Sequence, residues 1–174
     1  MRANTFLYHE VCDSPKESGI QKKSALPYKH TIDHFRSDLK LISNYYTFSS
    51  LCKDDSKNTL TPLFITFDDG GISAMKSAEI LEEQNWKGHF FIITSKINKP
   101  GFLRSSDIYS LYKRGHIIGS HSHTHTCPFR SLSYKSQSEE WRISKNIIED
   151  ILNDKITTAS VPGGDMDNTT IITA

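Results

Sequence analysis

The sequence predicts an α/β domain in which a parallel sheet is covered by helices. From residue 63 onward, short apolar runs alternate with amphipathic stretches in the order β-α-β-α-β-α-β. The apolar runs are nearly uninterrupted, as in strands that are buried on both faces. A chain of 174 residues is long enough for one domain with its own core. We therefore expect a single domain over residues 1–174, with either an open doubly wound sheet or a barrel.

The first 62 residues predict one strand and one helix. Residues 5–11, TFLYHEV, are rich in β-branched and aromatic side chains, which favour a strand. Residues 31–45 place Phe35, Leu39 and Ile42 on one helical face. Two segments with turn-forming and charged residues predict loops, 12–27 and 54–62.

The remaining chain supplies the alternating elements. Strands are expected over 63–70, 89–94, 116–122 and 156–164, the last running into a Pro-Gly-Gly turn. Helices are expected over 72–86, 105–115 and 136–153. In the first of these helices Met75, Ala78 and Leu81 share a face, and in the last Ile143, Ile147 and Ile151 align.

Composition excludes several classes of function. The net charge is +1 and no basic face or run is present, so nucleic acid is not an expected partner. No apolar run approaches the ~20 residues of a membrane helix. The three cysteines are widely spaced, and the N-terminus has no signal-peptide pattern. A cytoplasmic location is the default expectation.

Three polar or glycine-rich motifs follow predicted strands. Asp68, Asp69 and Gly70 end one strand, the histidine-rich HSHTH at 121–125 ends another, and VPGG at 161–164 ends a third. In parallel α/β folds ligands bind at the carboxyl ends of the strands. We expect the three motifs to meet at one rim of the sheet.

The adjacent acids Asp68 and Asp69 can divide two roles. If one carboxylate binds a cation, the other stays free to act as a base. The alternative is a plain turn, because Asp-Asp-Gly is ordinary turn chemistry.

The histidine motif predicts a metal site with one of two ligand sets. A helical turn puts His121 and His125 on one face. A strand puts His121, His123 and His125 on one face. Zinc suits two histidines and a carboxylate, with a fourth position left for water that then becomes a nucleophile. The alternative is a solvated histidine-rich loop.

The other histidines are isolated in the sequence. We expect structural or exposed positions for His9, His30, His34 and His89, and a capping or rim role for His116.

The glycines of VPGG let the backbone approach a ligand closely, and their N–H groups could serve as oxyanion donors. A tight turn without a further role is the alternative.

Together, TFDDG at 66–70 and HSHTH at 121–125 resemble the first and second motifs of the polysaccharide deacetylases of carbohydrate esterase family four, the NodB-like domain. The second motif has the form H-[S/T]-x-x-H, with Ser122 at its second position. The predicted elements between the two motifs also fit. FLYHEV and the loop after it look like the N-terminal segment of deacetylase-like proteins of exopolysaccharide gene clusters. The resemblance extends from about residue 5 to residue 165.

This resemblance implies an irregular (β/α) barrel with a metal at its C-terminal mouth. Carried over, Asp69, His121 and His125 bind the metal, which is zinc by default, with cobalt or nickel also compatible. Asp68 becomes the general base, and His123 falls on a variable position. The implied reaction removes N-acetyl groups from a hexosamine-containing polysaccharide or oligosaccharide.

The chain departs from the family pattern after the second motif. The family has an arginine that orients the catalytic acid, where this chain has Ser160. Pro162 matches the third motif, and Gly163 takes the position whose N–H would face the oxyanion. The family's late strands and its general-acid histidine lie further downstream, and no histidine follows His125. We therefore expect a barrel that is incomplete at the C-terminus and that binds metal yet hydrolyses weakly or not at all.

Two alternatives of other classes remain. A metal-dependent phosphoesterase or amidohydrolase also uses H-x-H strands, but there the motif usually opens the first strand and further histidines follow. A non-catalytic metal- or glycan-binding remnant would account for the absent acid.

Overall fold

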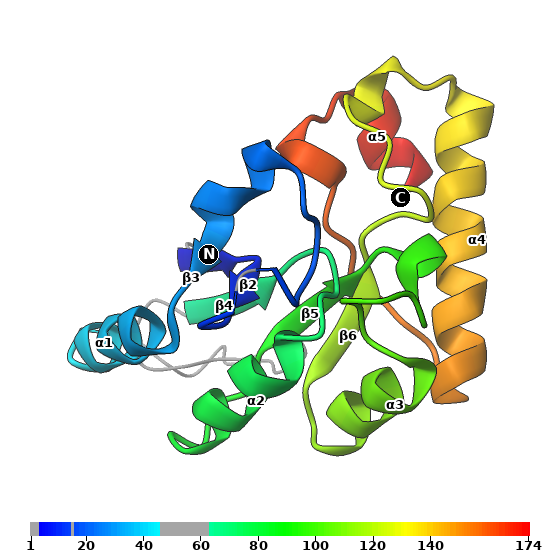
Figure 1. The fold of residues 1–174 in the computed structure, drawn as a ribbon. Helices are drawn as coiled ribbons and strands as arrows, with labels where there is room; N and C mark the ends of the chain where they lie inside the picture. The colour runs from blue at the N-terminus through cyan, green and yellow to red at the C-terminus, as the bar shows by residue number, and fades with distance from the viewer. Residues whose placement is uncertain (1–3, 15, 46–62) are drawn as a thin grey trace.

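A parallel four-stranded sheet forms the centre of the computed structural model, which describes residues 4–14, 16–45 and 63–174 (Figure 1). The strand order is β1-β4-β5-β6. These strands are β1 (Asn4–Tyr8), β4 (Leu63–Phe67), β5 (His89–Ile92) and β6 (Ile117–Ser120). The predicted parallel α/β fold is confirmed, and the predicted loop 54–62 lies outside the described residues.

The carboxyl ends of the strands lie along one edge of the sheet. Tyr8 at the end of β1 pairs with Phe67 at the end of β4, and Ile92 at the end of β5 pairs with Ser120 at the end of β6. The residues that follow these strands therefore emerge at a common rim.

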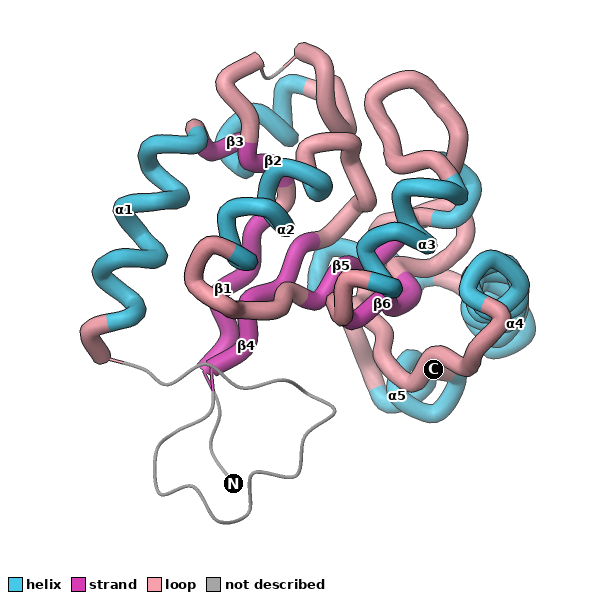
Figure 2. The backbone as a smooth tube through the Cα atoms, turned by 90° about the horizontal axis from the view of Figure 1, so that it is seen from below, coloured by secondary structure: helices cyan, strands magenta, loops and turns pink. Residues whose placement is uncertain are grey.

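Five α-helices in the described part of the chain surround the sheet. They are α1 (Ile32–Ser43), α2 (Ala74–Glu82), α3 (Ser105–Lys113), α4 (Tyr134–Leu152) and α5 (Asn168–Thr173). Figure 2 shows α1 beyond β1 at one end of the sheet and α4 beyond β6 at the other. In the part of the chain described, no helix combines the length and the apolar character of a membrane span.

Short elements complete the chain and modify two predictions. The predicted strand 5–11 is interrupted at His9, so that Glu10–Val11 forms β2, which pairs with β3 (Lys29–His30). The predicted loop 12–27 gives way to a 3₁₀ helix over Lys23–Tyr28. Three more 3₁₀ turns cover Thr94–Lys96, Phe129–Ser131 and Pro162–Gly164.

The core lies between the sheet and its helices, and aromatic rings line it. Phe67 stacks on Phe90 with ring centroids 4.8 Å apart, and Phe35 of α1 packs edge-on against Phe67. The predicted α1 face is confirmed, because Phe35, Leu39 and Ile42 are its buried residues. On α2, Ala78 and Leu81 are fully buried as predicted and Met75 packs at the margin.

The buried face of α4 differs from the prediction. Ile143, Ile147 and Ile151 are only partly buried, whereas Trp141, Ser144, Ile148 and Leu152 are the buried residues nearest to them. Part of the buried stripe is polar, which an apolar pattern cannot detect. The Ser144 hydroxyl lies 2.7 Å from that of Ser120 at the end of β6, and this hydrogen bond satisfies both groups.

The predicted strand 156–164 is wrong. Only Ala159 forms a bridge, parallel to Ser120, with Ser120 N donating to Thr158 O and Ser160 N donating to Ser120 O. Pro162 has no N–H to extend a ladder, and Gly163 has a φ of 66°, so the chain turns away. The sheet is therefore open, as expected for an incomplete (β/α) barrel, with β1 as one edge.

Candidate metal centre

The first polar loop begins where β4 ends. Asp68 N donates to Tyr8 O over 3.0 Å, so the start of the loop is tied to β1. Asp69 and Gly70 both have left-handed backbones, with φ of 73° and 74°. This conformation is costly for a residue with a Cβ. It turns the chain so sharply that both acids, each 5% exposed, lie in one buried site.

The histidine loop begins where β6 ends, and it is neither a strand nor a helix. Ser122 and His125 both have a φ of 61°. The Ser122 hydroxyl accepts from His125 N over 3.1 Å, and Ser122 N donates to Ser120 Oγ over 3.1 Å. The turn brings the rings of His121 and His125 to a centroid distance of 4.9 Å.

Asp69, His121 and His125 converge on one point. Asp69 Oδ1 lies 3.6 Å from Nε2 of His121 and 3.6 Å from Nε2 of His125. One possible ligand atom from each residue lies within 4.8 Å of the other two. Tetrahedral ligands at the usual zinc distances are roughly 3.4 Å apart, so the three atoms are spaced much as they would be around one cation.

Three buried atoms at this point have no hydrogen-bond partner among the described residues: Asp68 Oδ1, Asp69 Oδ1 and His121 Nε2. Buried polar atoms almost always have a partner, so three together require an explanation. Two imidazoles and a carboxylate are also a usual donor set of catalytic zinc sites. The residues present therefore fit a divalent metal.

The imidazoles are prepared to act as ligands. His121 Nδ1 lies 2.9 Å from the carbonyl oxygen of Ser160, which can only accept, so Nδ1 carries the proton and Nε2 presents its lone pair to Asp69. Burial lowers the pKa of His121 to about 4. Burial, with the nearby His121, lowers the pKa of His125 to about 4. Both rings are neutral at pH 7.

Burial has the opposite effect on the carboxyl groups. Burial first, and then the charges of Asp68 and Glu10, raise the pKa of Asp69 to about 7. Burial raises the pKa of Asp68 to about 6, against a hydrogen bond from Ser160 and the charge of His9. A cation beside them would stabilise the ionised forms.

His123 does not join the three converging residues. Its Nδ1 lies 2.9 Å from the Thr94 hydroxyl, and its carbonyl oxygen accepts from Ser95 N over 2.9 Å. His123 therefore connects the histidine loop to the 3₁₀ turn after β5, which fits its expected place outside the ligand set.

Ser160, which the resemblance places where the family has an arginine, contacts two site residues. Its hydroxyl donates to Asp68 Oδ2 over 2.9 Å, while its carbonyl oxygen accepts from His121. Pro162 and Gly163 follow two and three residues later in the chain, in a 3₁₀ turn where Pro162 is buried and Gly163 exposed.

His9 is a site residue that the sequence analysis missed. Because Tyr8 pairs with Phe67, the next residue of each strand, His9 and Asp68, emerge side by side at the rim. Burial lowers the pKa of His9, and the charge of Asp68 opposes this. In the sequence, the apolar run TFLY is followed by His-Glu, just as LFITF is followed by Asp-Asp. Polar residues directly after both strands would have indicated the same rim, had the pairing of the two strands been known.

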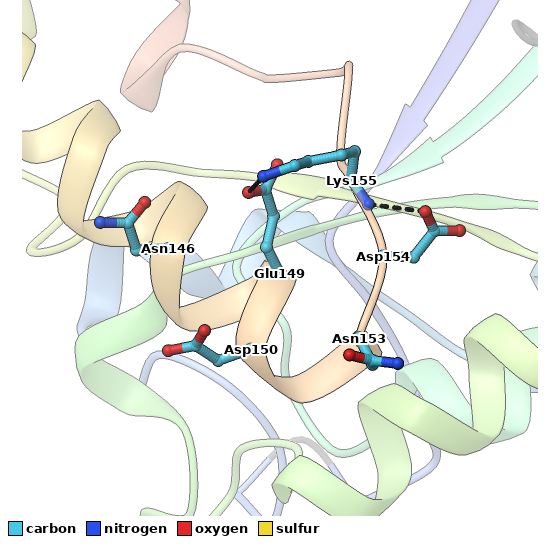
Figure 3. A pocket seen from close by; sticks show the side chains of 6 residues that line it. All are labelled: Asn146, Glu149, Asp150, Asn153, Asp154 and Lys155. Carbon is cyan, nitrogen blue, oxygen red and sulfur yellow. Dashed lines mark hydrogen bonds and ion pairs between the residues drawn. The ribbon is translucent and has the colours of Figure 1, made fainter.

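A separate depression lies at the C-terminal end of α4 and the residues that follow it (Figure 3). Polar and charged side chains line it: Asn146, Glu149, Asp150, Asn153, Asp154 and Lys155. Lys155 Nζ pairs with Glu149 over 2.8 Å across it. None of the candidate metal-centre residues takes part in this depression.

Residues 55–174, more than half of the chain, match the family described as polysaccharide deacetylase. The chain belongs to the polysaccharide deacetylase family. This assignment agrees with the resemblance of its first two motifs and makes the chain a member of an enzyme family. No curated protein matches the sequence.

Solved structures share the fold of this deacetylase at low sequence identity. A Streptococcus pyogenes deacetylase, PplD in complex with acetate, is 19% identical with a TM-score of 0.80, covering 99% of this chain and 79% of that one. A de-N-acetylase from Aggregatibacter actinomycetemcomitans is 17% identical with a TM-score of 0.81, covering 99% and 84%. A polysaccharide deacetylase from Bacillus cereus is 21% identical with a TM-score of 0.82, covering 99% of this chain and only 54% of that one. The chain therefore spans about half the length of this Bacillus protein.

Proposed function

We propose that this chain carries the catalytic centre of a metal-dependent N-deacetylase that acts on a hexosamine-containing polysaccharide. The family supports deacetylation. The supporting solved structures include a de-N-acetylase, which is consistent with an amide as the reacting bond. The observation that carries the proposal is the convergence of Asp69, His121 and His125 beside Asp68, where three buried atoms have no hydrogen-bond partner among the residues that the structure describes.

Asp69, His121 and His125 are the proposed metal ligands. Their donor set suits zinc, and cobalt or nickel would accept the same ligands. Such an ion would supply a Lewis acid for the acetamide carbonyl and would acidify water. The neutral imidazoles and the tautomer of His121 favour binding, because no proton has to be displaced from Nε2.

Asp68 and His9 are the proposed proton carriers. Asp68 takes a proton as the water oxygen bonds to the acetamide carbon, and a base with a pKa near 6 is well matched to neutral pH. When the C–N bond breaks, the amine nitrogen takes a proton from His9. Burial lowers the pKa of His9, and the charge of the neighbouring Asp68 opposes this effect by favouring the protonated form. Acetate and a free amino sugar result.

Pro162 and Gly163 are proposed to shape the wall beside the carbonyl oxygen, with Gly163 N–H as a donor.

The direct test measures acetate released from N-acetylglucosamine oligosaccharides by the purified chain. We expect release with zinc, loss of release after chelation and recovery when zinc is added back. Asp68→Asn should abolish release without loss of zinc, and Asp69→Ala should lose both.

Other outcomes would identify other functions. Hydrolysis of a phosphoester but not of the acetamide would indicate a metal phosphoesterase. Zinc binding with no hydrolysis of either substrate would indicate a metal- or glycan-binding protein without catalysis.

A further inference from the structure

The turn between the two candidate histidine ligands is held in an unfavourable conformation. Ser122 and His125 lie only three residues apart, and both have the left-handed backbone that favours glycine. Residues in such conformations persist when the surrounding structure over-determines them. The contacts that hold this turn therefore also decide whether the two imidazoles face Asp69.

Glu140 of α4 provides the densest set of these contacts. Its Oε2 accepts from His123 N over 2.9 Å and from Thr124 N over 2.7 Å. Its Oε1 accepts from the Thr124 hydroxyl over 2.8 Å. One carboxylate thus receives three hydrogen bonds from two successive residues in the middle of the turn. Hydrogen bonds to an ionised acceptor are among the stronger ones in proteins.

The helix that carries Glu140 is itself fixed to β6, the strand that directly precedes the histidine loop. Ser144, one turn further along α4, hydrogen-bonds to Ser120, which directly precedes His121. Trp141 is buried next to Glu140 in the sequence. The carboxylate therefore has a defined position relative to the end of β6.

The segment after β5 also holds the turn, by donating to its carbonyl groups. Thr94 N donates to Ser122 O over 3.3 Å, and Ser95 N donates to His123 O over 2.9 Å. These bonds fix carbonyl groups, whereas Glu140 receives the N–H groups. Without Glu140, the N–H groups of His123 and Thr124 lose the acceptor that they have among the described residues.

We propose that Glu140 is a positioning residue of the metal centre. It holds the peptide groups of His123 and Thr124 so that His121 and His125 stay directed at Asp69 before a metal binds. This inference rests on the proposed metal site. Glu140 is not one of the three converging residues, and its oxygens accept from the N–H groups of His123 and Thr124 and from the Thr124 hydroxyl.

The experiment compares zinc affinity, by competition with a chromogenic chelator, in the wild-type chain and three variants. We expect Glu140→Ala to weaken binding about 10- to 100-fold, as for other groups that orient metal ligands. Glu140→Gln should weaken it less than Glu140→Ala, because the amide oxygen can still accept from the two N–H groups. The matched control is Glu139→Ala, since Glu139 is exposed and pairs with Arg142 on the solvent side. Unchanged affinity in Glu140→Ala, or an equal loss in Glu139→Ala, would overturn the proposal.

A second measurement tests the inference without any metal. Hydrogen exchange at the His123 and Thr124 amides should be faster in zinc-free Glu140→Gln than in the zinc-free wild type, and faster still in Glu140→Ala. The role of Glu140 would be overturned if the wild type and Glu140→Ala exchanged at equal rates. If the alanine variant does not fold, the same comparison is made between the wild type and Glu140→Gln. If the wild type binds no zinc, the proposed function fails, while the exchange rates still decide whether Glu140 holds the turn.

Discussion

Ser160 donates a hydrogen bond from its hydroxyl to Oδ2 of Asp68 over 2.9 Å, across 92 residues of sequence. The family pattern has an arginine at the place of Ser160, so this chain orients its proposed base with a neutral hydroxyl instead of a cation. A neutral donor favours the ionised carboxylate less strongly than a nearby positive charge does. The Ser160 carbonyl also fixes the tautomer of His121, which makes this one residue a link between the base and a proposed ligand.

Replacing Ser160 by alanine should shift the pH dependence of deacetylation. Burial raises the pKa of Asp68 and the Ser160 hydroxyl opposes this effect, so loss of the hydroxyl raises that pKa further. A base must be deprotonated to act, so the acid limb of kcat against pH should move to higher pH. Zinc affinity should stay near the wild-type value, because the backbone carbonyl remains. An unshifted acid limb would argue against Asp68 as the base.

Replacing His9 by alanine should lower kcat about 10²- to 10⁴-fold, which is the usual contribution of a general acid or base. The zinc content should not change, because His9 is not among the three converging residues. His34 is exposed on α1, so His34→Ala serves as the control and should keep full activity. Both kcat and zinc stoichiometry are to be measured. Full activity of His9→Ala would show that another group protonates the leaving amine.

His116 should make the zinc-free protein less stable as the pH falls below neutrality. Its side chain is buried, Gly88 N donates to Nδ1 over 3.0 Å, and Nε2 lies 3.0 Å from Glu82. Burial lowers the pKa of His116 from 6.5 to about 4. Between these values the unfolded chain binds the extra proton and the folded chain does not. The contribution of His116 to the free energy of unfolding is therefore fully present above pH 6.5 and is lost progressively as the pH falls toward 4.

Urea unfolding at pH 7 and pH 5 measures this effect. His116 should account for a loss of about 2 kcal/mol between the two pH values. His116→Gln removes the titrating group, so the variant should lose less stability over the same interval than the wild type. Other buried histidines contribute equally to both proteins and cancel in the comparison. An equal loss in both proteins would contradict a lowered pKa of His116.

Gly71→Ala should destabilise the protein through a steric conflict with a buried acid. A Cβ at Gly71 would lie 2.0 Å from Oε1 of Glu10, whose side chain is bound by the Ser18 and Ser73 hydroxyls. We expect a loss of about 2 kcal/mol or more in the free energy of unfolding, as for overpacked cores.

Gly164 is the matched control, because a Cβ there meets nothing within 4 Å and only its φ of 64° is unfavourable. Gly164→Ala should cost about 1 kcal/mol. A larger loss for Gly164→Ala than for Gly71→Ala would contradict this description of Glu10.

Apolar periodicity predicted the helices and the parallel strands well, because their core faces are apolar. It failed where burial is polar, as on α4, where Ser144 is buried through its bond to Ser120. It also failed at 156–164, where only Ala159 forms a bridge to β6 and Pro162 has no N–H to extend a ladder. The rule that parallel strands end at one rim predicted that the acidic and histidine motifs would meet, whereas the choice of Asp69, His121 and His125 as ligands came from the family resemblance. His9 needed one more fact, the pairing of β1 with β4, which is a long-range contact that the local sequence does not encode.

The candidate site draws on segments from nearly the whole chain, namely His9, the acids after β4, the histidine loop, Glu140 and Ser160. Contacts of such sequence separation form slowly, because the loops between them must close first. During synthesis, the segment that carries Ser160 cannot contact Asp68 until it has left the ribosome. Capture of zinc with full affinity should therefore report that folding has gone to completion, and a chain that stops before residue 160 should retain the sheet's first strands without a tight metal site.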